Sequence, residues 1–248
     1  MRPELEPVAR DPARSAILLD FDGTLSDIVA RPELARPAEG VRGTLAALAE
    51  RYALVAVVSG RSTSEVRDLV GVPGVRYAGH YGSEAPGASL APSLREATAA
   101  AARAVEGAWV DDKGSSLAVH YRQAPDPAAA ALQLEGPLRP LAREHGLEVL
   151  EGKMVLELVP RGRPRKGAAV ERLVRESGAR AVLFAGDDLA DLEAFEAMDR
   201  LRAKGVHAVK VAVRGAEERP ELIRAADLVV ESPSALAALL GDLAAGPA

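Results

Sequence analysis

The pattern of apolar and polar residues differs between the two ends of the chain and its middle. In its first and last thirds, short runs of apolar residues alternate with segments whose apolar residues recur at helical spacing. The runs predict buried strands at residues 15–21, 52–58, 75–78, 181–185, 206–213 and 227–230. The helical spacing predicts helices at residues 37–51, 62–70, 166–177, 188–198 and 233–243. This alternation is typical of a parallel sheet covered by helices on both faces.

The middle of the chain has a different pattern of apolar and polar residues. Apolar and polar residues alternate there along short segments, as in antiparallel strands with one face in water. The pattern predicts, in chain order, a helix at 93–105, strands at 108–111 and 115–122, a helix at 127–145, and strands at 148–150 and 154–159. We therefore expect an α/β fold: a doubly wound, Rossmann-like parallel sheet built from residues 1–83 and 161–248, with an inserted α+β domain of order αββαββ at residues 84–160. We expect residues 1–15, which contain three prolines, to form a loose leader.

Composition narrows the class of protein. The chain has 31 Lys and Arg against 36 Asp and Glu, a net charge of −5, and no basic run of the kind that nucleic-acid phosphates attract. It has no cysteine, which excludes disulfide bonds and zinc sites built on thiolates. Its apolar runs are far shorter than the roughly 20 residues of a spanning helix, and its N-terminus lacks the apolar segment of a signal peptide. We expect a cytoplasmic protein that binds neither nucleic acid nor membranes.

Two aspartates follow the first predicted strand, in the string Asp20-Phe21-Asp22-Gly23-Thr24. Because side chains alternate along a strand, Asp20 and Asp22 should point the same way, with Phe21 in the core. Two carboxylates this close repel each other unless a cation or a shared proton separates them. That arrangement suits one ionised group beside one that carries a proton. The alternative is a plain turn at Asp22-Gly23.

Two further positions suit an anion. The second predicted strand ends in Ser59-Gly60-Arg61, where a hydroxyl, backbone N–H groups and a helix start come together. An ordinary turn with a capping serine is the alternative. Lys166 opens a predicted helix, a position where a cation opposes the helix dipole unless an anion lies beside it. The alternative there is a surface lysine in a basic stretch.

An acidic cluster, Asp187, Asp188 and Asp191, follows the strand predicted at 181–185. One of these acids is expected to cap the next helix, but three exceed what capping needs. Oxygen ligands without cysteine or clustered histidine select a hard divalent cation, and Mg²⁺ above all. His145 and His207 receive no role.

These motifs all lie at helix starts or at the carboxyl ends of predicted strands, where doubly wound sheets bind ligands. In this order they resemble the signature of the haloacid dehalogenase-like (HAD) phosphatases over nearly the whole chain. The resemblance implies that Asp20 attacks phosphorus to form an aspartyl-phosphate, and that Asp22 protonates the leaving oxygen and then activates water. It implies that the phosphoryl group is held by Ser59, Gly60 and Lys166. It implies that Mg²⁺ is bound by Asp20, the backbone carbonyl of Asp22, and Asp187. It also implies that Asp188 or Asp191 supports that ion.

Four strings, at residues 79–84, at Lys113 with 117–122, at 152–157 and at 186–188, resemble the trehalose-6-phosphate phosphatases within that superfamily. The resemblance implies hydrolysis of trehalose 6-phosphate, substrate recognition by the insert, and a functional link to trehalose-6-phosphate synthase. It implies that the substrate is bound by Arg61, His80, Glu84, Lys113, His120, Arg122, Lys153 and Glu157. Charged side chains read hydroxyls through directional hydrogen bonds. Aromatic residues make up only 3% of the chain, so stacking is not expected to dominate sugar recognition.

Two strings depart from the family pattern, and several alternatives stay open. Ala190-Asp191-Leu192 stands where the family usually has Thr-Asp-Glu, and His-Tyr-Gly at 80–82 replaces the commoner His-Gly. The same chemistry could serve a phosphate of sucrose, mannosylglycerate or glucosylglycerol. A catalytically silent sugar-phosphate sensor would be expected to lack an acid from the first or last motif, and none is lacking. A phosphomutase is disfavoured, because no motif marks a means of returning the phosphoryl group.

Overall fold

The computed structural model describes residues 2–82, 90–114, 116–162, 165–215 and 219–246. The chain divides into two compact units, one formed by Met1–Ser83 with Pro164–Ala248 and one formed by Glu84–Arg163. We call the first the core unit and the second the inserted unit, and we describe each by itself.

The core unit is built on a parallel sheet of six strands in the order β10-β9-β8-β1-β2-β3. The strands are β1 (Ser15–Leu19), β2 (Leu54–Val58), β3 (Arg76–Ala78), β8 (Ala181–Gly186), β9 (His207–Val213) and β10 (Leu228–Val230). The chain winds outward from β1 through β2 to β3, then returns to the other side of β1 and winds outward again through β9 to β10. The border between β1 and β8 is therefore the topological switch point, where sheets of this kind bind ligands.

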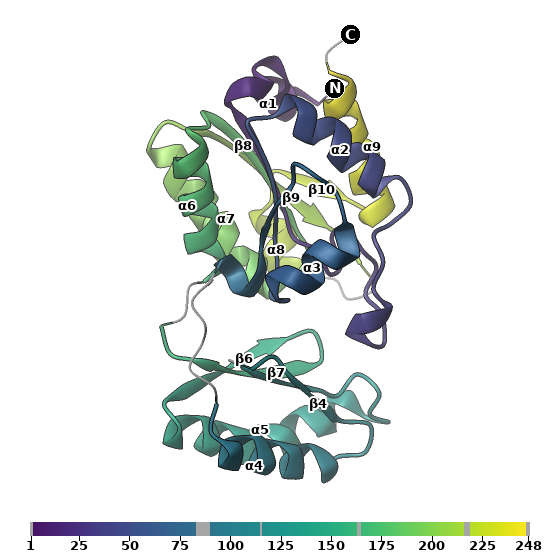
Figure 1. The fold of residues 1–248 in the computed structure, drawn as a ribbon, viewed down its shortest axis with the longest axis vertical. Helices are drawn as coiled ribbons and strands as arrows, with labels where there is room; N and C mark the ends of the chain where they lie inside the picture. Colours follow the sequence, from purple (N-terminus) through teal and green to yellow (C-terminus); the bar gives the residue numbers. More distant parts are fainter. Residues whose placement is uncertain (1, 83–89, 115, 163–164, 216–218, 247–248) are drawn as a thin grey trace. The chain divides into compact units, whose positions relative to one another are not determined.

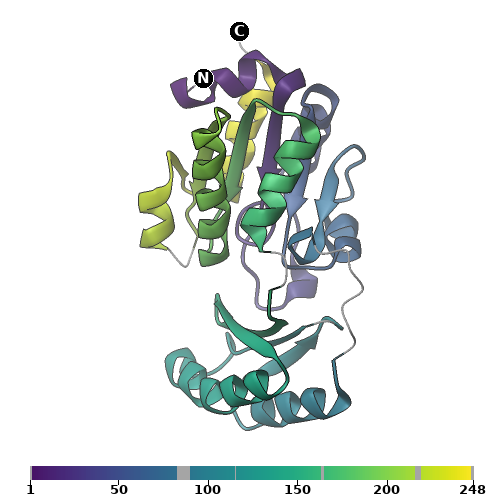
Figure 2. The same ribbon diagram turned by 90° about the vertical axis from the view of Figure 1, so that its left-hand side faces the viewer.

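Helices cover both faces of this sheet (Figures 1 and 2). Alternate residues of β1 point into different apolar layers: Ile17 and Leu19 join one, and Ala16 and Leu18 join the other. The first layer is closed by α1 (Glu6–Arg10), α2 (Val41–Arg51), α3 (Thr63–Val70) and α9 (Pro233–Ala245). The second is closed by α6 (Lys166–Ser177), α7 (Leu189–Ala203) and α8 (Pro220–Ala225). The doubly wound prediction is confirmed, and none of the described helices is long and apolar enough to cross a membrane.

The prediction of a loose N-terminal leader is wrong. Residues 3–14 form three short helical segments: a 3₁₀ turn at Pro3–Leu5, α1, and a second 3₁₀ turn at Pro12–Arg14. Leu5 and Val8 are buried in the first apolar layer. Each segment has a proline in its first turn, where the missing N–H has no helical partner to lose. Here the prolines start helical turns and do not prevent them.

Element boundaries follow local chemistry. α3 begins with the expected capping box, in which Ser62 and Glu65 bond each other's backbone N–H. α2 begins at Val41 and not at residue 37, because Gly40 at φ +80° turns the chain into it. The pattern missed α8, whose six residues are too few for apolar spacing to recur.

The inserted unit is an antiparallel sheet of four strands in the order β4-β5-β7-β6, with two helices (Figure 1). The strands are β4 (Trp109–Asp112), β5 (Leu117–His120), β6 (Leu147–Gly152) and β7 (Val155–Pro160); the helices are α4 (Pro92–Arg103) and α5 (Pro127–Glu144). The order αββαββ is as predicted. Leu117, Val119, Leu156 and Leu158 pack with the helices into one apolar core.

The opposite face of this sheet, which we call the open face, carries the intervening residues. Burial alternates along β7 from Val155 to Leu158 as expected, but Val159 on this face is buried as well, and so is Ala118 on β5. Ala118 is small and lies between its register partners Asp111 on β4 and Glu157 on β7, whose longer side chains cover it.

Candidate active site

The carboxyl ends of β1 and β8 bring two motifs together at the switch point. Asp20 is the first residue after β1, and its N–H still bonds the carbonyl of Ala185 on β8 at 2.9 Å. Asp187 is the first residue after β8. Carboxylate oxygens of Asp20, Asp187 and Asp191 lie within 4.8 Å of one another, and all three residues are buried. Segments more than 160 residues apart in sequence thus form one acidic cluster.

Lys166, the first residue of α6, lies inside this cluster. Its Nζ donates to Asp20 Oδ1 and to Asp191 Oδ1, each at 2.6 Å. These carboxylates supply the negative charge that a cation at a helix N-terminus requires. Burial alone would lower the pKa of the Lys166 ammonium, but the charges of Asp191 and Asp20 outweigh it and hold the pKa well above its usual value. Lys166 is therefore protonated.

The electrostatics of the cluster suit a divalent cation. Burial raises the pKa of Asp20 well above its usual value; the charge of Lys166 opposes this shift, and the charges of Asp191 and Asp187 add to it. With all three carboxylates ionised, they and the ammonium would carry a net charge of −2 in a buried place, which a divalent cation would neutralise. The donors are all oxygens, which is the ligand set of a hard metal ion. The residues present therefore fit a bound divalent cation.

Asp191, and not Asp188, belongs to the cluster. Oδ2 of Asp191 accepts from the backbone N–H groups of Asp187 and Asp188, both at 2.9 Å, while Oδ1 binds Lys166. Asp188 is the N-cap of α7, where it accepts from Leu189 N at 2.7 Å, and it lies 3.4 Å from Nε of Arg219. Asp191 thus ties the lysine to the loop that carries Asp187, while Asp188 performs the capping that one of the acids was expected to do.

The position of Asp187 depends on two neighbours of the first motif. Thr24 Oγ1 donates to Asp187 Oδ1 at 2.9 Å, and both residues are buried. Gly23 has φ +86°, and a Cβ placed there would lie 1.9 Å from Asp187 Oδ2. Only glycine lets the backbone next to Asp22 approach that carboxylate so closely. Sequence reasoning gave Thr24 no role, since its partner Asp187 lies 163 residues away in sequence.

The Ser59-Gly60-Arg61 loop lies at the carboxyl end of β2 and is held by its backbone. Ser59 is buried, and its Oγ accepts from the N–H of Arg61 at 3.2 Å. The carbonyls of Ser59 and Arg61 accept from Tyr81 N at 3.0 Å and His80 N at 2.8 Å. The turn Gly79–Gly82 therefore fastens this loop, and it places His80, one of the expected substrate ligands, beside it.

Tyr81 is a site residue that sequence reasoning missed. His80 and Tyr81 both have left-handed backbones, at φ 48° and 54°, a strain that residues other than glycine rarely hold. The Tyr81 ring centroid lies 5.6 Å from Lys166 Nζ. A Cβ at Gly60 would lie 3.0 Å from the Tyr81 hydroxyl. The departure at residues 80–82 thus places an aromatic ring against the buried lysine.

Arg61 binds the second aspartate of the first motif. Its Nε donates to Asp22 Oδ2 at 2.8 Å and its Nη2 to Asp22 Oδ1 at 2.6 Å, a bidentate pair. The Asp22 side chain is 37% exposed, whereas Phe21 beside it is fully buried, as the strand alternation predicted. Arg61 was expected to bind substrate, and in this structure its guanidinium holds Asp22.

The inserted unit brings together part of the expected sugar-binding set. Glu157 Oε1 accepts from Lys113 Nζ at 3.2 Å and from Ser116 Oγ at 2.8 Å. Sequence reasoning did not single out Ser116, since nothing in the pattern showed that it would reach across to β7. We call Lys113, Ser116 and Glu157 the Glu157 cluster.

The other expected ligands of this unit have contacts of their own. Arg122 donates through Nη2 to the carbonyl of Lys153 at 2.9 Å. His120 stacks on Trp109. Glu84 lies outside the described residues.

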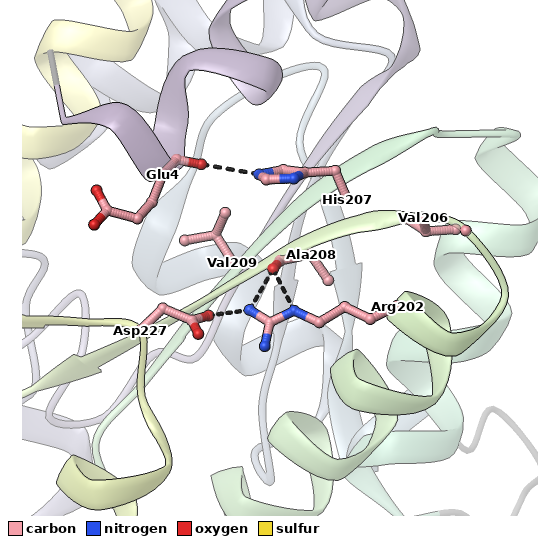
Figure 3. Close-up of a pocket in the computed structure, with 8 residues that line it drawn as sticks. Glu4, Arg202, Val206, His207, Ala208, Val209 and Asp227 are labelled. Atoms are coloured by element: carbon pink, nitrogen blue, oxygen red, sulfur yellow. Dashed lines mark hydrogen bonds and ion pairs between the residues drawn. The ribbon is translucent and has the colours of Figure 1, made fainter.

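A pocket of about 560 Å³ lies at the amino-terminal end of β9, in the core unit (Figure 3). Its polar groups bind one another: Arg202 Nε donates to the carbonyl of Ala208 at 2.8 Å and its Nη2 pairs with Asp227. His207 Nε2 lies 2.9 Å from the carbonyl oxygen of Glu4. The contact of His207 with Glu4 joins the N-terminal segment to β9, and Arg202 joins α7 to β9 and to Asp227 before β10.

Known proteins resemble this chain along most of its length. The sequence model of the trehalose-phosphatase family matches residues 18–89 and 89–227. The trehalose-phosphate phosphatase of Mycobacterium avium is 36% identical over 248 aligned positions, which cover 92% of this chain and 62% of that protein. The chain therefore spans less than two thirds of the length of that relative.

Solved structures show the same fold. The C-terminal domain of Candida albicans trehalose-6-phosphate phosphatase superposes with a TM-score of 0.81 at 24% identity, over 99% of this chain and 97% of that one. A haloacid dehalogenase-like hydrolase from Bacteroides thetaiotaomicron superposes with a TM-score of 0.57 at 18% identity, over 91% and 98%. The fold is that of the HAD-like hydrolases, and because the family model matches most of the sequence, the chain belongs to the trehalose-phosphatase family.

Proposed function

We propose that this chain is a Mg²⁺-dependent phosphatase that hydrolyses trehalose 6-phosphate to trehalose and phosphate. The observation that carries the chemistry is the buried cluster of Asp20, Lys166, Asp187 and Asp191 at the switch point of the sheet. Membership of the trehalose-phosphatase family supports the choice of substrate.

Asp20 is the proposed nucleophile. A carboxylate oxygen of Asp20 forms a bond to phosphorus as the bond from phosphorus to the sugar oxygen breaks, and Asp22 gives that oxygen its proton. In the second half, water attacks the phosphorus of the aspartyl-phosphate and passes a proton to Asp22. The bond between Asp20 and phosphorus then breaks, which releases phosphate and restores both side chains.

Arg61 controls access to Asp22 in this mechanism. Both oxygens of Asp22 accept from the guanidinium, which holds this side chain against Arg61. Binding of an anionic phosphate monoester would give Arg61 an alternative partner. The pair is therefore proposed to open as substrate arrives.

The phosphoryl group is proposed to be held by the Ser59 hydroxyl, the backbone of Gly60 and the Lys166 ammonium, at a turn that precedes the N-terminus of α3. The metal would be held by Asp20, Asp187 and the backbone carbonyl of Asp22, with Asp191 keeping Asp187 and Lys166 in place. When bound, Mg²⁺ would neutralise charge on the phosphoryl oxygens.

Sugar recognition is proposed for the inserted unit. The Glu157 cluster combines an acceptor with two donors, and His120, Arg122 and Lys153 add further polar groups on the same unit. A site of directional partners rejects sugars that leave its groups unpaired. His80 and Glu84 complete the proposed set, and residues 84–160 are the proposed recognition domain.

A silent sugar-phosphate sensor is the alternative of another class. Such a protein needs to bind a phosphate, but it does not need a nucleophile bound to a buried lysine. Asp20, Asp22 and Asp187 are all retained, and Asp20 is positioned by Lys166 at 2.6 Å. This observation favours an enzyme.

Phosphate release from a panel of sugar phosphates, with and without Mg²⁺, tests the proposal. The panel contains the phosphates of trehalose, sucrose, mannosylglycerate and glucosylglycerol. We expect Mg²⁺-dependent release from trehalose 6-phosphate above the others, with Asp20→Asn leaving under about 0.1% of the turnover, as loss of a nucleophile does. Asp68→Asn, the same change at an exposed position on α3, is the control. Equal activity of Asp20→Asn and wild type would remove the nucleophile assignment, and preference for another sugar would change the substrate alone.

A further inference from the structure

The only tryptophan of the chain lies in the inserted unit and stacks on an expected substrate ligand. The ring centroids of Trp109 and His120 are 4.3 Å apart and their planes differ by 12°. The two residues are register partners on β4 and β5, so they share the open face. Trp109 takes no part in the apolar core of the unit, which lies on the opposite face with Val110. Core packing therefore does not explain this tryptophan.

The direction of the stack follows from the strand order. Neighbouring strands lie about 4.8 Å apart, close to the separation of the two rings, so the rings stand side by side across the strands. Trp109 covers His120 from the side of β4, an edge strand. The other ring face of His120 is turned toward β7, where Val155 is its register partner.

His120 and the Glu157 cluster are neighbours on this face. Glu157 on β7 is the register partner of Ala118, which lies two residues before His120 on β5. The side chains of Glu157 and His120 are therefore diagonal neighbours. An imidazole on a sheet face has several staggered orientations open to it. The Trp109 ring, parallel to the imidazole with its centroid 4.3 Å away, excludes the orientations that would point the imidazole toward β4.

We propose that Trp109 is a positioning residue for sugar recognition: by covering one face of His120, it holds the imidazole beside the Glu157 cluster so that both bind hydroxyls of the same sugar. This inference rests on the proposed function, and it assigns a specificity role to a residue that touches neither the phosphate nor the metal. A hydroxyl-reading site discriminates only when its donors and acceptors are held in fixed directions.

Kinetics with two substrates test the role. Trp109→Leu removes the stack, and Trp109→Phe keeps an aromatic ring. We expect Trp109→Leu to raise KM for trehalose 6-phosphate about 2- to 10-fold, the equivalent of one aromatic pair, with kcat and the KM for p-nitrophenyl phosphate unchanged. Trp109→Phe should recover most of the loss. Val110→Ala, on the same strand but facing the apolar core, is the control for damage to the unit.

Fluorescence gives a readout that does not depend on turnover. With one tryptophan in the chain, emission reports on position 109 alone. We expect trehalose 6-phosphate to change this emission saturably in Asp20→Asn, because His120 acquires a new partner, and inorganic phosphate to leave it unchanged.

Each result has a defined meaning. A constant emission at calorimetric saturation, or a Trp109→Leu variant with wild-type KM, overturns the positioning role. So does an equal rise in KM for both substrates or an equal rise in Val110→Ala, since either indicates structural damage. If wild type releases no phosphate from trehalose 6-phosphate, the proposed function itself fails, whereas normal turnover with an unaffected Trp109→Leu removes only this inference.

Discussion

The acidic cluster of the core unit and the Glu157 cluster of the inserted unit are built differently. In the core unit, the side chains of Asp20, Lys166 and Asp191 are 9%, 4% and 0% exposed, and backbone N–H groups fix the loop around them. In the inserted unit, the side chains of Lys113 and Glu157 are 19% and 13% exposed. Their arrangement depends on long side chains and one serine hydroxyl.

This difference predicts which part of the chain tolerates substitutions. Around the acidic cluster, even a methyl group meets a carboxylate or the backbone, so chemistry and fold constrain each other. On the open face of the inserted sheet, a side chain can be exchanged without disturbing the apolar core on the other side. Changes in the core unit should therefore affect every substrate, and changes in the inserted unit should affect one kind of substrate.

Among changes that leave every proposed catalytic side chain in place, the largest effect is expected from Gly23→Ala. The added methyl would lie 1.9 Å from Asp187 Oδ2, at a backbone φ of +86° that alanine disfavours. Displacing a catalytic group by about 1 Å costs roughly 100-fold, and we expect at least that loss in kcat/KM for trehalose 6-phosphate and for p-nitrophenyl phosphate alike. Gly40→Ala, at φ +80° with open space around it, is the matched control. A loss limited to the sugar phosphate would break the comparison.

Thr24→Val tests how the buried hydroxyl supports the metal site. It removes the bond from Thr24 Oγ1 to Asp187 Oδ1 and keeps the shape of the side chain. Loss of such a partner of a metal ligand costs about 10- to 100-fold in metal affinity, which calorimetric titration with Mg²⁺ would measure. Thr98→Val is the control, because Thr98 is buried in α4 and its Oγ1 has no hydrogen-bond partner in the described part of the chain. Unchanged Mg²⁺ affinity would place the metal away from Asp187.

Ser116→Ala should give a smaller and selective effect. It removes the 2.8 Å bond that Ser116 donates to Glu157. A hydrogen bond to a charged group contributes about 1.5–3 kcal/mol, and Lys113 retains part of the arrangement, so we expect KM for trehalose 6-phosphate to rise about 10-fold. The KM for p-nitrophenyl phosphate should stay constant. Ser93→Ala, exposed on α4, is the control, and a loss with both substrates would count against separate roles for the two units.

Much of the fold could be predicted from the sequence. Apolar runs followed by helical spacing indicate a parallel sheet, because strands buried on both faces have no polar side. The N-terminal segment was the failure: three prolines in fifteen residues favoured a loose chain, yet each lies in a first helical turn. The burial of Leu5 and Val8 depends on an apolar layer formed by distant strands, which no local pattern contains.

The site was predictable as a set of residue types at strand ends, but not as a network. The spacing of Asp188 and Asp191 is that of a capping box, and it is compatible with either residue lying near the metal. The contacts of Asp191 with Lys166 and with two backbone N–H groups identify Asp191 as the member of the acidic cluster. The partners of Arg61 and Ser116 are 39 and 41 residues away in sequence. Such pairs depend on strand register and loop geometry, which single-chain periodicity does not specify.

The smallest expected effect concerns the turn that carries Lys113. Asp112 accepts from Arg95 Nε at 2.6 Å and from Gly114 N at 2.8 Å. The hydrogen bond from Arg95, together with that from Gly114 and the charge of Arg95, lowers the pKa of Asp112 against a weaker opposing effect of burial. A carboxyl whose pKa is lower in the folded state stabilises the fold above its unfolded pKa, and that stabilisation is lost as pH falls through the folded pKa.

Urea unfolding of Asp112→Asn across pH measures this contribution. Because the pair is 30% and 43% exposed, we expect the variant to be less stable than wild type by at most about 1 kcal/mol at pH 7. The difference should shrink as pH falls below the usual range of aspartate, since wild type then loses the same interaction. Glu96→Gln, exposed on the same helix as Arg95, is the control. A difference of several kcal/mol would mean that the turn of the inserted unit is held as firmly as the acidic cluster, and the contrast between the two regions would disappear.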